Sequence, residues 1–294
     1  MNVKSGISAE EISFSASHTL FVEGEEDSID VSVLRKILPI RVKHLGTSCC
    51  VRSVAIALIK EHPKYYFLVD RDHFDDETVE KSWSSFPQSD MPNLLIWRKK
   101  ELENYFIDPE YLLQSDYLSA DRERLEDSLK KRIKSCAKEY LYIGAANRVI
   151  VNIRESLKHR WIDVFRDRSV FGTEDEALHQ LQARQEFGEH RLCINKVTSS
   201  AYLEESFRKE LNMLTGGATD LEWGKGRWLD LLPAKGIMHN ILRSTLFTVM
   251  DKDGKKLSPN DQEKEIIKNL LSPTKAMPRD FVELRDLITK IMVP

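Results

Sequence analysis

The stretches FVEGEED at residues 21–27 and FLVDRD at residues 67–72 each begin as an apolar run and end in carboxylates. Strands more often end on the Gly, Asn or Ser residues that suit turns, so two strand ends made of acids suggest a use for the charge. Glu23 closes the first predicted strand, and Asp70 and Asp72 close the other. Gly24 permits a tight turn directly after Glu23. These stretches therefore predict two loops that carry negative charge to one edge of a sheet.

The sequence around these stretches alternates between strand and helix signals. The segments HTLFVEG, IRVKHLG, KYYFLVDRD and PNLLIWRKK have strand character, and amphipathic helical segments separate the first three. Strands joined by helices in this way form a mostly parallel sheet with both faces covered. In such a Rossmann-like sheet, ligand-binding residues gather at the carboxyl ends of the strands. We therefore expect an α/β domain with its site at that edge.

From about residue 121 the sequence changes to long helical periodicities. Apolar residues recur at helical spacing over 121–139, 145–160, 174–190, 199–214, 261–271 and 279–291. We therefore expect a catalytic domain over residues 1–118 and a mostly helical domain over residues 119–294. The helical domain would contact substrate, partner or a second copy of the chain.

The composition is that of a folded globular protein. The chain has 294 residues, of which 41% are apolar and 31% charged, and its net charge is −3. The N-terminus lacks the apolar core of a secretory signal, and no apolar stretch reaches the roughly 20 residues that span a bilayer. The cysteines lack CxxC spacing, which disfavours zinc and a disulfide framework, so we expect reduced, mostly buried thiols. A cytoplasmic protein without a membrane partner fits best.

Four acids form the predicted centre. Asp27 lies four residues after Glu23 and can return toward the same pocket, while alternation along the strand places Asp70 and Asp72 on one side. Carboxylates that share one place repel each other strongly. Mg²⁺ or Mn²⁺ prefers such oxygen ligands, and two ions can clamp a phosphodiester during in-line displacement. These residues therefore predict a site for divalent metal, with two ions expected.

Two neighbouring acids could serve the helix rather than a metal. Acids in the first turn of a helix stabilise its positive end, and we expect only this role for Glu25. Glu26 remains open, because one helical turn could also direct its carboxylate to the metals.

The arrangement of these acids resembles a known family. A strand ending in Glu-Gly, an Asp four residues later and a strand ending in Asp-x-Asp are similar to the TOPRIM domain of topoisomerases, primases and OLD-type nucleases. The likeness covers roughly residues 17–115, and LLIWRKKELENYFIDPEYL resembles the OLD-like branch. The resemblance implies that an acid after this strand completes the second metal site. Glu103 is the better match and Glu101 the alternative, although Glu101 could equally be a solvated charge.

The same resemblance assigns a catalytic lysine. The segment WLDLLPAKGIMHNIL resembles a Pro-Gly-Lys segment in which the lysine neutralises charge developing on the phosphate. Lys235 would take this role, beside Glu23 and Asp70 as catalytic residues. Ala234 stands where the family has Gly, so the alternative is an ordinary lysine at a turn before a helix.

A basic stretch follows in the helical region. Residues 130–168 hold eleven Lys and Arg against four acids, with aromatic residues interleaved. Such a stretch suits nucleic-acid phosphates and bases, and the candidates for binding are Lys131, Arg132, Arg154 and Arg160. An acidic partner surface, or simply solvated helix faces, would produce the same pattern.

The chain has no GxxxxGK[ST] motif and cannot be its own P-loop ATPase. A stand-alone TOPRIM domain with ELENY and a helical C-terminal half resembles the effector nucleases of PARIS-type anti-phage systems. That resemblance implies a toxic, metal-dependent endonuclease that cleaves RNA such as tRNA. It also implies a separate ABC-type ATPase subunit that restrains the nuclease, a phage trigger protein that releases it, and an active homodimer. The alternatives are a DNA-directed nuclease, a primase-like enzyme, or a catalytically silent partner of an ATPase.

Overall fold

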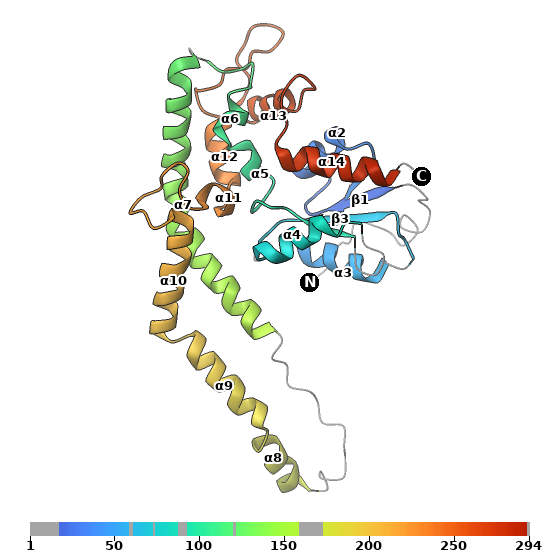
Figure 1. Cartoon of the computed structure of the whole chain (residues 1–294), viewed down its shortest axis with the longest axis vertical. Coiled ribbons are helices and arrows are strands. Elements are labelled where there is room, and N and C mark those ends of the chain that lie inside the picture. Colours follow the sequence, from blue (N-terminus) through green and yellow to red (C-terminus); the bar gives the residue numbers. More distant parts are fainter. Residues whose placement is uncertain are drawn as a thin grey trace. The chain divides into compact units, whose positions relative to one another are not determined.

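The computed structural model describes residues 18–58, 61–72, 74–87, 93–119, 122–158 and 173–292. The chain divides into two compact units (Figure 1). The first contains the chain up to Tyr140 and from Trp228 onward, and the second contains residues 141–227. This division differs from the expected one into residues 1–118 and 119–294, because the C-terminal helices share a unit with the sheet.

The first unit contains a sheet of four parallel strands in the order β2-β1-β3-β4. The strands are β1 (Thr19–Val22), β2 (Arg41–His44), β3 (Tyr65–Val69) and β4 (Leu94–Ile96). All residues of β1 and β3 are buried, as expected for central strands covered on both faces. Figure 1 shows α2 and α14 on one side of the sheet and α3 and α4 on the other. The prediction of a parallel α/β sheet is confirmed.

The helices between the strands are α2 (Ile29–Ile37), α3 (Ser48–Leu58) and α4 (Asp76–Ser84). Helix α2 begins later than expected, because Ser28 is its N-cap and its side chain accepts a hydrogen bond from the Val31 amide at 3.4 Å. Gly24, with φ +100°, and the acids at 25–27 form the turn before it. The late start places Asp30 in the first turn of the helix.

The rest of the described chain is mostly helical, as predicted, although the helix expected over 174–190 is divided into two. The first unit continues with α5 (Glu103–Phe106), α6 (Pro109–Leu112), α11 (Trp228–Leu231), α12 (Lys235–Leu242), α13 (Pro259–Leu270) and α14 (Arg279–Met292). The second unit holds α8 (Glu174–Gln182), α9 (Gln185–Val197) and α10 (Ser200–Thr215). Helix α7 (Arg122–Lys158) runs from the first unit into the second. It replaces two expected helices, because no proline or cap interrupts the residues between them.

An aromatic cluster joins α14 to the segment after β4. The Phe281 ring is fully buried, with its centroid 5.0 Å from that of Tyr105, 5.7 Å from Trp97 and 6.1 Å from Phe106. The Tyr105 hydroxyl also donates to Asp280 at 2.5 Å. These contacts join residues far apart in the sequence and account for the place of the C-terminal helix in the same unit as the sheet.

No helix in the described part of the chain is both long and apolar enough to cross a membrane. The cysteine thiols form no disulfide, but the expectation that most are buried is wrong. Cys136 is buried, Cys49 is exposed, and Cys50 and Cys193 are intermediate.

The aromatic cluster leads to a stability prediction. Replacing Phe281 by Ala is expected to lower the free energy of unfolding by about 3–5 kcal/mol, because it leaves a cavity between α14 and the segment after β4. Lys290, exposed on the same helix, is the control, and Lys290→Ala should change stability by less than about 0.5 kcal/mol. Denaturant unfolding of both variants checks this, and similar values for the two would contradict the packing.

Candidate metal centre

The two acidic strand ends meet at the switch point of the sheet. Strands β1 and β3 are neighbours, yet the chain leaves β1 toward β2 on one side and leaves β3 toward β4 on the other. Glu23 follows β1 directly and Asp70 follows β3. The Asp70 backbone amide donates a hydrogen bond to Glu23 Oε1 at 2.9 Å. One carboxylate therefore reaches across to the end of the neighbouring strand.

Further acids surround Asp70. Burial raises the pKa of Asp70 well above its usual range, and four nearby negative charges raise it further. These charges belong to Asp30, Glu23, Glu101 and Glu103. The pKa of Glu23 is also raised by burial, although the hydrogen bond from the Asp70 amide opposes that shift. The site thus contains more negative charge than its surroundings neutralise.

Two other acids of the cluster have raised pKa values for the same reason. Burial raises the pKa of Asp30 to about 6, and the charge of Glu101 adds to the shift. Burial likewise raises the pKa of Glu103 to about 7, with Asp30 and Glu101 contributing. Lys235 acts in the opposite direction on both groups, so its ammonium lies near this side of the cluster.

Glu101 holds the start of α12 at the cluster. Its Oε1 accepts hydrogen bonds from the backbone amides of Ala234 at 2.5 Å and Lys235 at 2.7 Å. These are amides at the start of a helix, where an anion is favoured. Glu101 is therefore an anchored member of the cluster, whereas Glu103 is almost fully buried within it, with 6% of its surface exposed. The sequence offered the two as alternatives, and the structure brings both to the site.

Asn104 fastens the segment after β4 to the chain before α12. Its buried side chain donates to the carbonyl oxygens of Leu229 at 2.8 Å and Leu232 at 3.0 Å. Its Oδ1 accepts from the Glu101 amide at 3.1 Å. The asparagine of ELENY thus joins two segments more than a hundred residues apart, beside the direct contact between Glu101 and the start of α12.

Asp72 lies at the exposed side of the cluster in a strained conformation. Its φ is +40°, which a residue with a side chain rarely adopts. Its carboxylate is 3.8 Å from Lys100 Nζ, and its charge raises the pKa of Glu23. The backbone of Lys100 is held on both sides. Its carbonyl accepts a hydrogen bond from the Arg71 amide at 3.0 Å, and the Lys100 amide donates to the Asp230 carbonyl at 2.7 Å. Lys100 is thus a second cation at the site, which the sequence motifs did not single out.

The structure does not bring two of the predicted ligands into this cluster. Glu26 is exposed and pairs with Arg35 at 2.6 Å and His44 Nδ1 at 3.0 Å, and the hydrogen bond from Arg35 lowers its pKa. Asp27 is exposed in the turn before α2. Both positions follow from the start of α2 after these residues, and a metal-binding role for either acid stays a prediction.

Asp30 is the acid that sequence reasoning missed. It occupies the first turn of α2, where the capping residue Ser28 places it, and its charge acts on Asp70 and Glu103. The available signal was Ser28 itself, because serine is favoured at the N-cap and an acid is favoured within the following turn.

The predicted nucleic-acid contacts lie in both units. Lys131 and Arg132 are exposed on the part of α7 in the first unit, and Arg154 is exposed on its part in the second. Arg160 and the aromatic residues interleaved with the distal part of this stretch lie outside the described residues. Another cation of the stretch, Arg148, is used internally, since its Nε lies 2.7 Å from the buried carboxylate of Glu210. A role in nucleic-acid binding remains a prediction.

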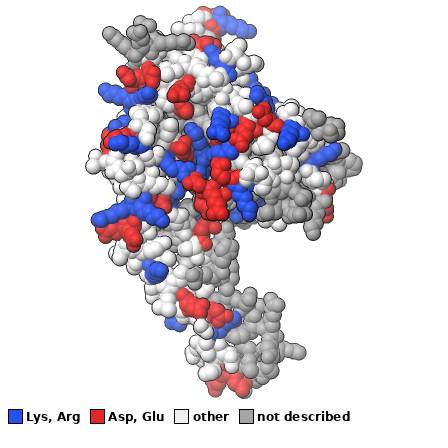
Figure 2. Space-filling view, in the orientation of Figure 1, with Lys and Arg blue, Asp and Glu red and all other residues white. Residues whose placement is uncertain are grey.

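Charges of both signs lie interleaved on the face of the molecule that Figure 2 shows. This agrees with the net charge of −3. Binding of a polyanion on this face would therefore depend on a few placed cations rather than on a broad positive field.

Among the described residues, no three His, Cys, Asp or Glu side chains converge closely enough to form a ready-made metal site. The acids around Asp70 are grouped loosely and share oxygen donors only, a donor set suited to hard cations such as Mg²⁺. No protein-family model matches the chain, and no curated protein matches it.

The raised pKa of Glu103 predicts a pH-dependent stability. Its folded-state pKa of about 7 exceeds the ordinary 4.5, so its contribution to stability is present below about pH 4.5 and is lost as pH rises through 7. In metal-free buffer at about pH 8, Glu103→Gln should therefore be more stable than the wild type by on the order of 1–3 kcal/mol.

The difference should disappear at about pH 4, where Glu103 is protonated. The control is Glu139→Gln, a change at an exposed acid of α7, which should shift stability little at either pH. Unfolding curves at the two pH values test this, and a gap that is equal at both would contradict the assignment.

The Asn104 contacts predict a second stability change. Asn104→Ala leaves the carbonyls of Leu229 and Leu232 without their donor and should destabilise the protein by about 2–4 kcal/mol. Asn240→Ala is the matched control, because Asn240 is exposed and its side chain donates to Gly236 in its own helix. If Asn104→Ala lowers the free energy of unfolding no more than the control does, the hydrogen bonds of Asn104 contribute little to stability.

Proposed function

We propose that this chain is a divalent-metal-dependent nuclease that hydrolyses phosphodiester bonds, with RNA as its substrate. One observation carries the proposal. At the switch point of a parallel sheet, Glu23 and Asp70 share a hydrogen bond and are surrounded by further acids, with Lys235 beside them. Such a concentration of carboxylates is unfavourable unless a cation neutralises it.

The donor set fits Mg²⁺ or Mn²⁺, and two ions are proposed. Glu23, Asp70 and Asp72 would hold metal on one side of the cluster, and Asp30 and Glu103 on the other. The raised pKa values of Asp30, Asp70 and Glu103 support this fit, because they arise from burial and uncompensated negative charge. When bound, such ions lower the pKa of a bound water and neutralise the phosphate.

The cations of the chain complete the proposed chemistry. Lys235 would face the scissile phosphate and stabilise the negative charge that develops on its oxygens. Its position is set by the hydrogen bonds from the Ala234 and Lys235 amides to Glu101. Lys100, near Asp72, would orient the phosphate from the opposite side. Two cations that lie near different acids of the cluster suit a substrate held between them.

The TOPRIM assignment and the wider biology rest on the resemblance of the sequence motifs. We propose an OLD-like TOPRIM nuclease of the cytoplasm that cleaves tRNA or other RNA as a toxic effector of anti-phage defence. A separate ABC-type ATPase subunit would restrain it, a phage trigger protein would act through that complex, and the released nuclease would act as a homodimer. The ELENY segment and the acidic strand ends support this assignment.

Expression of the wild type beside single-site variants tests the proposal. Glu23→Ala and Asp70→Ala should abolish toxicity and the appearance of new RNA ends, and Lys235→Ala should reduce cleavage by roughly 10²-fold or more. Asp253→Ala, a change at an exposed loop acid, is the control and should leave activity unchanged.

Sequencing of cellular RNA ends and gel analysis of DNA provide the measurements. Purified protein should require Mg²⁺ or Mn²⁺, and a chelator should stop cleavage. Fragmented DNA with unchanged RNA ends would overturn the RNA assignment. Activity retained after Glu23→Ala and Asp70→Ala would overturn the mechanism.

A further inference from the structure

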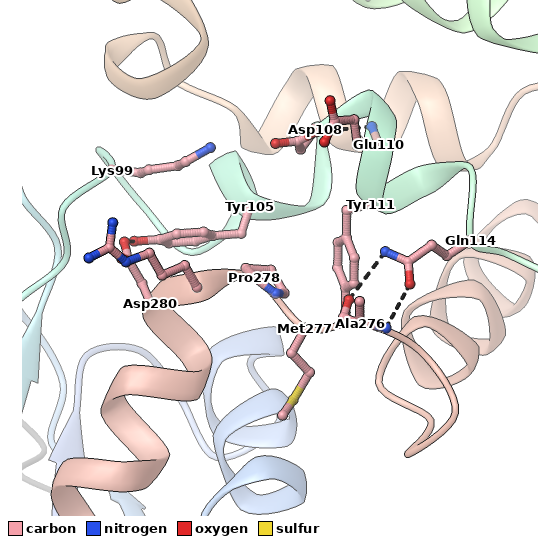
Figure 3. A pocket seen from close by; sticks show the side chains of 11 residues that line it. Lys99, Tyr105, Asp108, Glu110, Tyr111, Gln114, Ala276, Met277, Pro278 and Asp280 are labelled. Carbon is pink, nitrogen blue, oxygen red and sulfur yellow. Dashed lines mark hydrogen bonds between the residues drawn. The ribbon is translucent and has the colours of Figure 1, made fainter.

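A pocket of about 360 Å³ lies beside the segment that carries Glu101 and Glu103 (Figure 3). Its walls come from residues 99–114, which include α5 and α6, and from residues 276–280 at the start of α14. Both stretches belong to the first unit. The volume falls in the range of small-ligand sites and accommodates a single nucleotide.

Several polar groups of the pocket are occupied in building it. The Tyr105 hydroxyl donates to Asp280, and the Tyr111 hydroxyl donates to the Leu270 carbonyl at 2.8 Å. The Gln114 side chain forms two hydrogen bonds with the backbone of Ala276, which Figure 3 shows. The framework is therefore held by its own contacts and does not need a ligand to form.

Two cations face the pocket. Lys99 lies with its Nζ 5.2 Å from the centre of the Tyr105 ring and 3.3 Å from Asp230. Arg279 is exposed and lines the pocket, and its charge also lowers the pKa of Glu283. The remaining acid at this end, Asp280, is already paired with Arg98 at 2.9 Å. A guanidinium and an ammonium placed in this way suit a phosphate group.

Two carboxylates line another part of the pocket. Asp108 accepts from the Glu110 amide at 2.9 Å through Oδ1 and so caps α6, which leaves Oδ2 for another donor. Glu110 is exposed and lines the pocket, and its charge also raises the pKa of Lys130. In Figure 3 both side chains lie on the same side of the pocket. Carboxylates only accept hydrogen bonds, so their partners are donors such as sugar hydroxyls.

We infer that this pocket binds one ribonucleotide unit of the substrate RNA, an inference that rests on the proposed function and names how the substrate is selected. Lys99 and Arg279 hold its phosphate, and Asp108 and Glu110 accept hydrogen bonds from its ribose hydroxyls. Acids bind ribose 2′-hydroxyls in the same way in dinucleotide-binding folds. DNA lacks the 2′-hydroxyl, so it leaves these carboxylates without a donor.

The test measures binding by the Glu23→Ala protein, so that no substrate is cut. Fluorescence anisotropy compares an RNA oligonucleotide with DNA of the same sequence. Asp108→Asn combined with Glu110→Ala should weaken RNA binding by about tenfold and leave DNA binding unchanged. Asp108→Asn keeps an oxygen that can cap α6. Arg279→Ala should weaken both, and Asp253→Asn, at an exposed loop acid outside the pocket, should change neither.

RNA with 2′-methoxy groups should bind as weakly as DNA, because it has lost the donor. An RNA-to-DNA affinity ratio that the Asp108 and Glu110 changes leave untouched overturns the inference. Competition tests the source of the ribonucleotide. If the Asp108 and Glu110 changes weaken the binding of free ribonucleoside monophosphates but not that of RNA, the pocket binds free nucleotides, and its assignment to RNA is overturned.

The two proposals fail in distinguishable ways. RNA binding that depends on Asp108 and Glu110, without any metal-dependent cleavage by the wild-type chain, would contradict the proposed nuclease activity and support the ribonucleotide site. Cleavage that Glu23→Ala abolishes, together with an RNA preference that the Asp108 and Glu110 changes do not alter, would contradict the ribonucleotide site and support the nuclease activity.

Discussion

Repulsion between carboxylates at the switch point of the sheet is the constraint around which the first unit is arranged. Glu23 and Asp70 are brought together by the geometry of adjacent parallel strands, and Asp30, Glu101 and Glu103 add to the same field. Partial burial makes this charge more costly than it would be on the surface. The fold supplies partial compensation through the Asp70 amide and Lys235. A divalent cation would neutralise the negative charge that remains.

The segment after β4 connects this site with the rest of the first unit. Through Asn104 it holds the chain before α12, and through Glu101 it holds the first turn of α12, where Lys235 lies. Through Tyr105 it holds α14. The same segment forms a wall of the nucleotide-sized pocket. The proposed centre and the proposed ribonucleotide site therefore share one segment of the chain, so the residues that shape the centre would also position a substrate bound in the pocket.

Local patterns are sufficient for much of the fold. The four strands are short apolar runs with helices between them, a pattern that is typical of a parallel sheet. Local patterns are less reliable for boundaries. The acids at 25–27 resemble the opening of α2, but Ser28 caps it, and this later start places Asp30 in its first turn, where its charge acts on Asp70. The full extent of α7 was not predicted, because nothing in the sequence marks a stop or a continuation there.

The sequence by itself determined that acids end β1 and β3 and that these ends lie at the same edge of the sheet. Strand direction and alternation settle this without any knowledge of distant packing. Only the tertiary structure decided which other charges join them. Asp30 reaches the cluster through a helix cap, Glu101 through its contact with the start of α12, and Lys100 through the hydrogen bond that its carbonyl accepts from the Arg71 amide. These positions depend on residues distant in the chain or on one capping bond, which periodicity does not encode.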